Sequence, residues 1–380
     1  MFIVLAIVLF ISIYGFSNFY IGLRGWQLLG SFVPFLNNKV YWIFFWFVAV
    51  SYLIARLLNK YIPQFVGNAI TLIGAYWMAV MIYAIILLGL LDITRLVSRF
   101  CGFKPQWMSY SSHFGNFIVG AALLLIIGTT MLFGTLHAVN VKINHYDIDI
   151  PKKAGQLKDL KVALISDTHL GNIVNKKRLE GIVEKINDLK PDLVLIAGDT
   201  VDDVIEPYVK QNMAETFRKL HPKYGVYAVL GNHEYYGGKI SDIVSNFEKG
   251  SIQVLRDQYV KIADSFYIVG REDCSDKNRK GLDQIMNGLD KSLPVIEMDH
   301  QPVKLGEPEK NGVDLQLSGH THGGQLFPQR IIDRFIFEKD WGYLRKGDFQ
   351  LIVSSGAGTW GPPIRTGSNS EIVSINIKFK

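Results

Sequence analysis

Two histidines one residue apart, His320 and His322, stand in a glycine-rich turn directly after an apolar run. Four earlier apolar runs also end in side chains that can bind a cation. These are Asp167 and His169 after KVALIS, Asp199 after DLVLIAG, Asn232 and His233 after GVYAVLG, and His300 after LPVIEMD. Any one of them alone would be explained as a turn residue, because Asp and Asn are poor strand formers and favour turns. Five such ends in one chain indicate a shared site.

The chemistry of this donor set favours a pair of metal ions. It offers carboxylate, amide and imidazole groups and no thiolate. Mixed nitrogen and oxygen ligands suit Mn²⁺, Fe or Zn²⁺. The set is too large for one tetrahedral ion and fits two ions that share a carboxylate, which together can activate water and clamp a phosphoryl oxygen. We therefore expect two divalent metal ions, with Mn²⁺ as the first candidate and Fe and Zn²⁺ as the others.

The elements that must position these donors are strands of an α/β domain. From Val141 onward, short β-branched runs alternate with polar helical stretches, as in α/β folds. Ligands of such sheets bind beyond the carboxyl ends of the strands. Glycines beside the donors allow positive φ and the close approach of a bulky anion; they are Gly198, Gly231, Gly319, Gly323 and Gly324.

The chain before about residue 140 is strongly apolar. A membrane-spanning helix needs about 20 mostly apolar residues, and four stretches are candidates, at about 2–23, 40–58, 65–91 and 114–138. The second is long enough only if Arg56 snorkels to the membrane interface. We predict an all-α membrane domain of four transmembrane helices over residues 1–139, followed by a globular domain over residues 140–380.

The ordered motifs resemble those of the calcineurin-like metallophosphoesterases. The motifs are D-x-H at Asp167–His169, GD at Asp199, GNHE at Gly231–Glu234, the single His300, and GHTHGG at Gly319–Gly324. The resemblance covers roughly residues 140–380 and implies a four-layer α/β/β/α sandwich of mixed β-sheets. By the same resemblance, Asp167, His169 and His322 hold one metal. Asn232, His300 and His320 hold the second metal, and Asp199 bridges the two.

The resemblance also implies a catalytic set made of His233, Asp199 and Asn232. His233 would be the general acid or a phosphate-positioning residue, and a hydroxide between the metals would be the nucleophile. One departure is informative: the Ser/Thr protein phosphatases of this superfamily carry GDxxDRG, whereas this chain has GDTVDD, with Asp203 in place of the arginine. This departure weighs against a protein phosphatase.

The segment SSGAGTWGPPIRTGSNSEI, residues 354–372, follows GHTHGGQ as it does in a bacterial branch of the superfamily. That branch includes membrane-associated enzymes and relatives of UDP-2,3-diacylglucosamine pyrophosphatases. The four-span front end is similar to transmembrane proteins with a metallophosphoesterase domain. GAGTWG matches GxGxxG, but Pro362 and Pro363 follow instead of a helix, so we exclude a dinucleotide site.

Three further features have two interpretations each. Arg365 in that segment and Asp273 after the run FYIVG are predicted substrate contacts, with a purely structural role as the alternative. The stretch Arg330–Tyr343 mixes bulky apolar and basic residues. It is expected either to enter the membrane interface beside the site or to pack as an ordinary core segment.

These observations predict a membrane-bound phosphohydrolase that acts on a phosphoester or pyrophosphate of a lipid or lipid-linked substrate. Fewer than 30 residues separate Ala138 from Asp167, which keeps the site near the bilayer. A net charge of +6 suits anionic headgroups or phosphorylated substrates. The expected partners are the bilayer and that substrate, without nucleic acid. The alternatives are a broad phosphodiesterase of nucleotides or nucleic acid, which needs a basic track with stacking aromatics, and a non-catalytic membrane scaffold.

The expected location is the cell membrane, as a multi-pass protein. Basic residues do not decide its orientation, because five flank the spans on each side: Arg24, Lys39, Arg95, Arg99 and Lys104 against Arg56, Lys60, Lys142, Lys152 and Lys153. The lipid-precursor relatives favour the cytoplasmic side for the globular domain. Two cysteines without a CxxC pattern argue against a disulfide framework, and nothing in the sequence predicts an oligomeric state.

Overall fold

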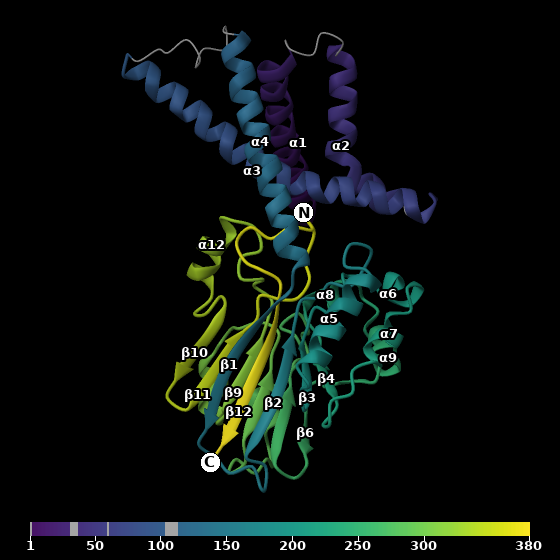
Figure 1. The fold of residues 1–380 in the computed structure, drawn as a ribbon, viewed down its shortest axis with the longest axis vertical. Coiled ribbons are helices and arrows are strands. Elements are labelled where there is room, and N and C mark those ends of the chain that lie inside the picture. Colours follow the sequence, from purple (N-terminus) through teal and green to yellow (C-terminus); the bar gives the residue numbers. More distant parts are fainter. Residues whose placement is uncertain (1, 31–36, 59–60, 103–112) are drawn as a thin grey trace. The chain divides into compact units, whose positions relative to one another are not determined.

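The computed structural model describes residues 2–30, 37–58, 61–102 and 113–380 (Figure 1). Lys60 and Lys104, which entered the charge count, lie outside these residues. The chain forms two compact units, Met1–Gly134 and Thr135–Lys380. We describe each unit by itself.

The N-terminal unit is a membrane domain built from long apolar helices. Four helices are long and apolar enough to cross a membrane, with mean hydropathies of 2.0, 1.8, 2.2 and 2.3 among the described residues. They are α1 (Phe2–Leu29), α2 (Asn38–Leu58), α3 (Gln64–Phe100) and α4 (His113–Val139). The last turn of α4 belongs to the second unit.

Two of these helices are longer than the predicted spans. Helix α1 continues past Arg24, and α3 continues past Asp92, so the helices extend beyond residues 23 and 91. The charged side chains pair with each other: Arg24 Nη2 lies 2.7 Å from Asp92 Oδ2, and the Tyr20 hydroxyl donates to the same oxygen at 2.8 Å. Because these charges are paired within the bundle, they do not end the helices, whereas the sequence prediction stopped at the first charge.

The second unit contains two mixed six-stranded sheets. The first has the order β1-β12-β2-β3-β4-β5, and the second has the order β10-β11-β9-β8-β7-β6. The strands are β1 (Lys142–Ile150), β2 (Asp159–Ile165), β3 (Leu193–Ala197), β4 (Val226–Val229), β5 (Ile252–Val254), β6 (Gln258–Ile262), β7 (Phe266–Gly270), β8 (Val295–Met298), β9 (Leu315–Ser318), β10 (Gly342–Lys346), β11 (Phe349–Val353) and β12 (Glu371–Phe379). Strands β2 to β5 are parallel, as are β7, β8, β9 and β11.

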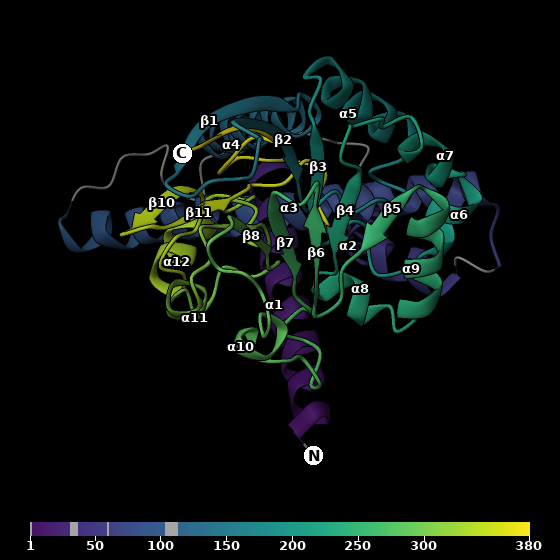
Figure 2. The same ribbon diagram turned by 90° about the horizontal axis from the view of Figure 1, so that it is seen from below.

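Helices cover the outer faces of both sheets. They are α5 (Lys176–Asp188), α6 (Glu206–Lys210), α7 (Met213–Phe217), α8 (Asn232–Tyr236), α9 (Ile240–Lys249), α10 (Leu282–Ile285), α11 (Gly306–Asn311) and α12 (Gln329–Ile336). Figure 2 shows the two sheets stacked, with α5 and α10 on opposite outer sides.

Alternation along the strands explains the layers. In β2, Leu160, Val162 and Leu164 enter the core between the two sheets, together with Ile296 of β8. Ala163 and Ile165, which alternate with them, instead pack in the core that contains α5, α7 and α9. Residues two apart point to the same face of a strand, so one apolar run serves both cores. The predicted four-layer α/β/β/α sandwich is confirmed.

Candidate metal centre

The predicted donors lie just beyond the carboxyl ends of five strands. Asp167 follows β2, Asp199 follows β3 and Asn232 follows β4 in the first sheet, while His300 follows β8 and His320 follows β9 in the second. The parallel neighbours in each sheet end at one edge. The two edges meet, because the backbone N–H of His320 donates to the Asp167 carboxylate at 3.0 Å. The fold therefore gathers donors that lie up to 155 residues apart.

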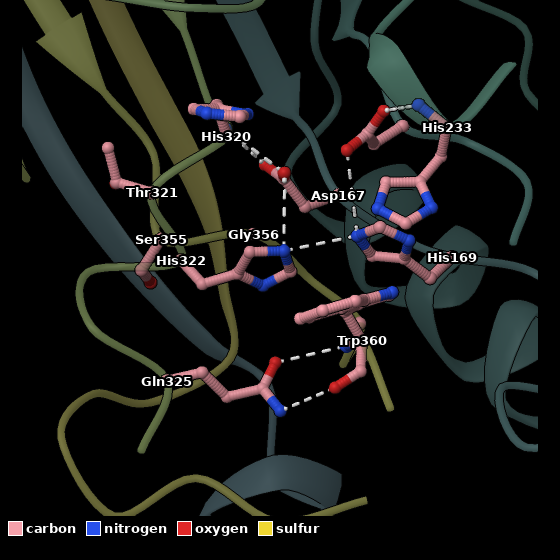
Figure 3. Close-up of polar contacts among 12 residues, drawn as sticks. Asp167, His169, His233, His320, Thr321, His322, Gln325, Ser355, Gly356 and Trp360 are labelled. Atoms are coloured by element: carbon pink, nitrogen blue, oxygen red, sulfur yellow. Dashed lines mark hydrogen bonds and ion pairs between the residues drawn. The ribbon is translucent and has the colours of Figure 1, made fainter. Parts of the chain in front are cut away.

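One donor group consists of Asp167, His169 and His322. A ligand atom from each lies within 4.8 Å of the others. His169 Nε2 and His322 Nε2 are 3.1 Å apart, and His322 Nε2 is 3.5 Å from Asp167 Oδ1 (Figure 3). These three residues are the ones that the resemblance assigns to one metal.

A second donor group consists of Asp199, His300 and His320, again with ligand atoms within 4.8 Å. His300 Nε2 lies 3.1 Å from Asp199 Oδ2. The Asn232 side-chain oxygen joins this group at 2.9 Å from His320 Nδ1. The same Asp199 oxygen lies 3.8 Å from His169 Nε2 of the first group. Asp199 is thus the carboxylate that faces both groups.

The protonation of the imidazoles suits cation binding. Burial lowers the pKa of His169 to about 3 and that of His320 to about 4, and burial also holds the pKa of His322 well below its ordinary value. These rings are therefore neutral at pH 7, the form that binds metals. The buried His169 Nδ1 has no hydrogen-bond partner. Neutral imidazole nitrogens clustered with carboxylates fit divalent cations.

His300 is oriented by the first sheet. Its Nδ1 lies 2.7 Å from the Ala197 carbonyl, to which it donates, so that Nε2 faces Asp199. Burial opposes a charge on this ring, but the Asp199 carboxylate outweighs burial and raises the pKa of His300 well above its ordinary value. Such an N–H to carbonyl bond behind a histidine is typical of metal ligands.

Five of the predicted metal ligands have a left-handed backbone. Their φ values are 48° at Asp167, 45° at His169, 50° at Asp199, 74° at His320 and 52° at His322. Non-glycine residues adopt this conformation rarely, and it gathers at functional sites. The neighbouring glycines allow the loops to approach the ligand carboxylates closely. A Cβ on Gly231 would overlap the Asp199 carboxylate, and a Cβ on Gly319 would overlap that of Asp167.

Glu234 holds the loops that carry these ligands. Its fully buried carboxylate accepts four backbone N–H bonds, from Asp199 (3.0 Å), Thr200 (2.7 Å), Val201 (3.0 Å) and Gly231 (2.7 Å). It therefore ties the loop after β3 to the loop after β4. Glu234 had no predicted role, although it is the last residue of the GNHE motif.

His233 has a carboxylate behind it and aromatic rings beside it. Its Nδ1 lies 2.6 Å from Asp203 Oδ1. Burial would lower the pKa of His233, but the Asp203 hydrogen bond contributes to raising it above the ordinary value. Trp360 and Tyr236, which are 53% and 67% exposed, lie with ring centroids 5.6 and 5.2 Å from the His233 ring.

Trp360 was not predicted as a site residue. Gln325 fixes it through the backbone, because Trp360 N donates to the Gln325 side-chain oxygen at 3.0 Å and Trp360 O accepts from its amide at 2.9 Å (Figure 3). The exposed ring therefore belongs to a rigid loop at the edge of the donor groups. The signal in the sequence was the aromatic residue within GAGTWG.

We expect Asp203→Asn to lower kcat by about 10- to 100-fold, the usual effect of removing the carboxylate that orients a functional histidine. The change leaves the donor groups intact, so bound metal should stay at the wild-type level. The measurement is steady-state hydrolysis of bis-p-nitrophenyl phosphate, with metal content determined on the same samples. Asp202→Asn is the matched control, because Asp202 is the acid that GDxxDRG retains. If kcat fell further in Asp202→Asn than in Asp203→Asn, the assignment of Asp203 as the carboxylate that orients His233 would be contradicted.

Arg365, predicted either as a substrate contact or as a structural arginine, lies inside the fold. Its side chain is fully buried and donates to backbone carbonyls of Ser355 (2.6 Å), Gly358 (2.8 Å) and His322 (3.0 Å). The guanidinium therefore fastens the GHTHGG turn to the loop after β11 and presents no free donor to a substrate. A buried arginine is stable there because many carbonyl oxygens satisfy its donors.

Asp273, predicted either as a substrate contact or as a turn residue, also has its partners inside the fold. This residue is fully buried, and its two carboxylate oxygens accept from the Gln301 amide at 3.1 and 2.9 Å. One of them also accepts the Ser275 backbone N–H at 2.8 Å. Asp273 thus braces the loop after β7 against the residue that follows His300.

Residues 160–324 match the family described as calcineurin-like phosphoesterase, a range that includes all seven predicted metal ligands. An uncharacterized metallophosphoesterase of Aquifex aeolicus is 36% identical over 259 residues, which cover 65% of this chain and 96% of that protein. The chain belongs to the calcineurin-like metallophosphoesterase family. This metallophosphoesterase is also similar to one from Campylobacter jejuni, at 31% identity over 265 residues, 68% of this chain and 69% of that protein.

The name of a further relative of this metallophosphoesterase mentions both a membrane and this domain. It is a transmembrane protein with metallophosphoesterase domain from Danio rerio, 30% identical over 280 residues that cover 70% of this chain. The aligned part spans 64% of the Danio rerio protein. Together with the four apolar helices, this similarity identifies a membrane protein.

Proposed function

We propose that this metallophosphoesterase is a membrane-bound phosphohydrolase that binds two divalent cations and hydrolyses a phosphoester or pyrophosphate of a lipid or lipid-linked substrate. The observation that carries the two-metal part is Asp199, whose carboxylate lies 3.1 Å from His300 Nε2 and 3.8 Å from His169 Nε2. Asp167, His169 and His322 would hold one ion. Asn232, His300 and His320 would hold the other, and Asp199 is shared between them.

Two bound cations, with Mn²⁺ as the first candidate, would supply an activated water and neutralise charge on the phosphoryl oxygens. The chain supplies the proton. Because His233 Nδ1 is hydrogen-bonded to Asp203, its Nε2 is free to protonate the leaving oxygen, as a general acid must. The rings of Trp360 and Tyr236 lie beside His233 and would contact the leaving group of a bound substrate.

Two observations support a lipid substrate. The Ala138 carbonyl in the last turn of α4 accepts from Ser370 Oγ at 2.8 Å and from Arg178 Nη2 at 2.7 Å, so the end of a membrane-spanning helix is fastened to the catalytic unit. Phe337, an apolar ring, lies 5.8 Å from His320 between ring centroids. The phosphate of an acyl lipid would lie near the end of the membrane-spanning helix, and its apolar part would contact Phe337. We place the catalytic unit on the cytoplasmic face, where lipid precursors are made.

The test is a substrate panel on the purified full chain with Mn²⁺. The panel contains phosphatidic acid and a UDP-linked acyl sugar in mixed micelles, soluble nucleotides, and bis-p-nitrophenyl phosphate. We expect kcat/KM for at least one lipid phosphate to exceed that for nucleotides by about tenfold or more, because only the lipid gains apolar contacts near Phe337. Equal or faster turnover of soluble nucleotides would contradict the lipid assignment.

One observation favours a second candidate, a phosphodiesterase of nucleotides. The exposed rings of Trp360 and Tyr236 flank His233, and exposed aromatic rings can stack on a base. The nucleotide arm of the same panel distinguishes this candidate. Trp360→Ala would then raise KM for nucleotides and leave KM for bis-p-nitrophenyl phosphate unchanged.

A further inference from the structure

Helix α12 presents its apolar side chains outward and its acidic side chain inward. Ile331, Ile332, Phe335 and Ile336 are 52%, 57%, 87% and 66% exposed, and Phe327 just before the helix is 54% exposed. We call these five residues the α12 patch. Asp333 on the same helix is buried. A surface helix of a soluble domain has the reverse pattern, with apolar residues facing the core. This pattern therefore indicates that α12 contacts an apolar environment outside the domain.

The α12 patch adjoins the metal centre. The residue after α12 is Phe337, whose ring lies 5.8 Å from the His320 ring. At the other end of the helix, the backbone N–H of Phe327 donates to Thr366 Oγ1 at 3.0 Å. The patch is thus anchored at both ends to loops that line the site.

The same loop connects the α12 patch to the membrane-spanning helix α4. Residues 354–370 include Thr366, which contacts Phe327, and Ser370, which donates to the Ala138 carbonyl at 2.8 Å. The Ser370 backbone N–H also donates to the His137 carbonyl. The α12 patch and the last turn of α4 are therefore joined through one loop of the second unit by hydrogen bonds.

Charge around the α12 patch fits an anionic lipid surface. From Gln329 to Lys346 there are five basic and three acidic residues. Arg334 has a 63% exposed side chain, and Arg330 is partly exposed; both lie near the largely buried Asp340. Exposed apolar residues with basic neighbours are the composition of helices that lie in the membrane interface.

We propose that α12 is a membrane-interface helix whose patch inserts between the headgroups of an anionic leaflet beside the metal centre. The occupant of the patch is the bilayer in which α1 to α4 reside. This inference deepens the proposed function and rests on it for one consequence: a lipid phosphate would reach the metal centre along Phe337 without leaving the leaflet.

The direct test measures the depth of α12 in the full chain. Cys101 and Cys274, both free and exposed, are replaced by serine, and Phe335→Cys carries an environment-sensitive fluorophore. The protein is reconstituted in phosphatidylcholine vesicles that contain phosphatidylglycerol and a lipid with a spin label near its headgroup. Lys158→Cys is the matched control, because Lys158 is exposed and precedes β2 at the edge of the sheet opposite the metal centre.

We expect the lipid-borne spin label to quench the fluorophore at position 335 at least about twice as strongly as the fluorophore at position 158, as for an interfacial residue. Equal quenching by aqueous iodide at both positions, without lipid quenching at 335, would overturn the proposal. A second result would also overturn the proposal. In it, neither quencher reaches the label at position 335 until the protein is diluted in the vesicles. That result would mean that a second copy of the chain covers the patch.

An activity arm separates this inference from the proposed function. Phe335→Asp is expected to lower turnover of vesicle-borne phosphatidic acid by about tenfold, since a charge disfavours insertion, while hydrolysis of soluble bis-p-nitrophenyl phosphate stays unchanged. Val209→Asp, at an apolar residue of α6 that is 50% exposed, is the control and should change neither rate. A wild-type protein that is quenched at 335 but hydrolyses neither compound would sink the proposed function and leave the insertion intact. An unchanged lipid rate in Phe335→Asp would count against the insertion alone.

Discussion

Asp199→Asn is expected to lower kcat/KM for bis-p-nitrophenyl phosphate by more than about 100-fold, beyond the loss usual for residues that only support a metal ligand. The substitution keeps the shape of the side chain and removes the charge that faces His169 and His300. Both donor groups would lose the ligand that we propose they share, so bound metal should fall from the proposed two equivalents per chain to one or fewer. Metal analysis after desalting and steady-state kinetics in Mn²⁺ measure the two effects.

Asp264→Asn is the matched control for this variant. Asp264 has φ of 51°, close to the 50° of Asp199, but its side chain is 95% exposed in the turn between β6 and β7. The same chemical change in the same backbone conformation should leave activity and metal content unchanged there. Full activity of Asp199→Asn with two bound ions would refute the shared-ligand assignment. An inactive wild-type protein that binds metal would favour the scaffold alternative.

Glu234→Gln is expected to destabilise the catalytic unit by at least about 2 kcal/mol. Each Glu234 oxygen accepts two backbone N–H groups. An amide nitrogen in place of one oxygen would leave two buried donors without an acceptor, at about 1–3 kcal/mol each. In a domain of this size, such a loss lowers Tm by at least about 4 °C. Thermal unfolding of the purified full chain, followed by catalytic-domain tryptophan fluorescence, measures the shift.

Glu248→Gln provides the comparison, because Glu248 is exposed on α9 and its substitution should leave Tm unchanged. The metal-free protein should show the same difference between the two variants, since the four N–H bonds to Glu234 do not involve a metal. A Glu234→Gln variant that unfolds at the wild-type temperature would mean that the loops after β3 and β4 do not need this carboxylate.

The sequence does not predict which of the candidate site residues are buried. Arg365 and Asp273 were proposed as substrate contacts with a structural role as the alternative, and both side chains are fully buried. Their partners are backbone carbonyls and a side-chain amide from distant loops, and a residue's burial depends on what packs above it. Asp203 shows the same limit: the motif marked it as a departure, but only the fold brought it within hydrogen-bonding distance of His233.

The sequence by itself determined the class of the site and the kind of fold. Short apolar, β-branched runs that end in Asp, Asn or His predict strands with donors at one edge, and four long apolar stretches predict membrane helices. Tertiary structure decided which donors face each other. It bent Asp167, Asp199 and His320 into left-handed conformations, placed Glu234 and Asp203 behind them, and turned the apolar side of α12 outward. These features depend on contacts between residues far apart in the chain, because only packing between distant loops can hold a strained backbone or bury a charge.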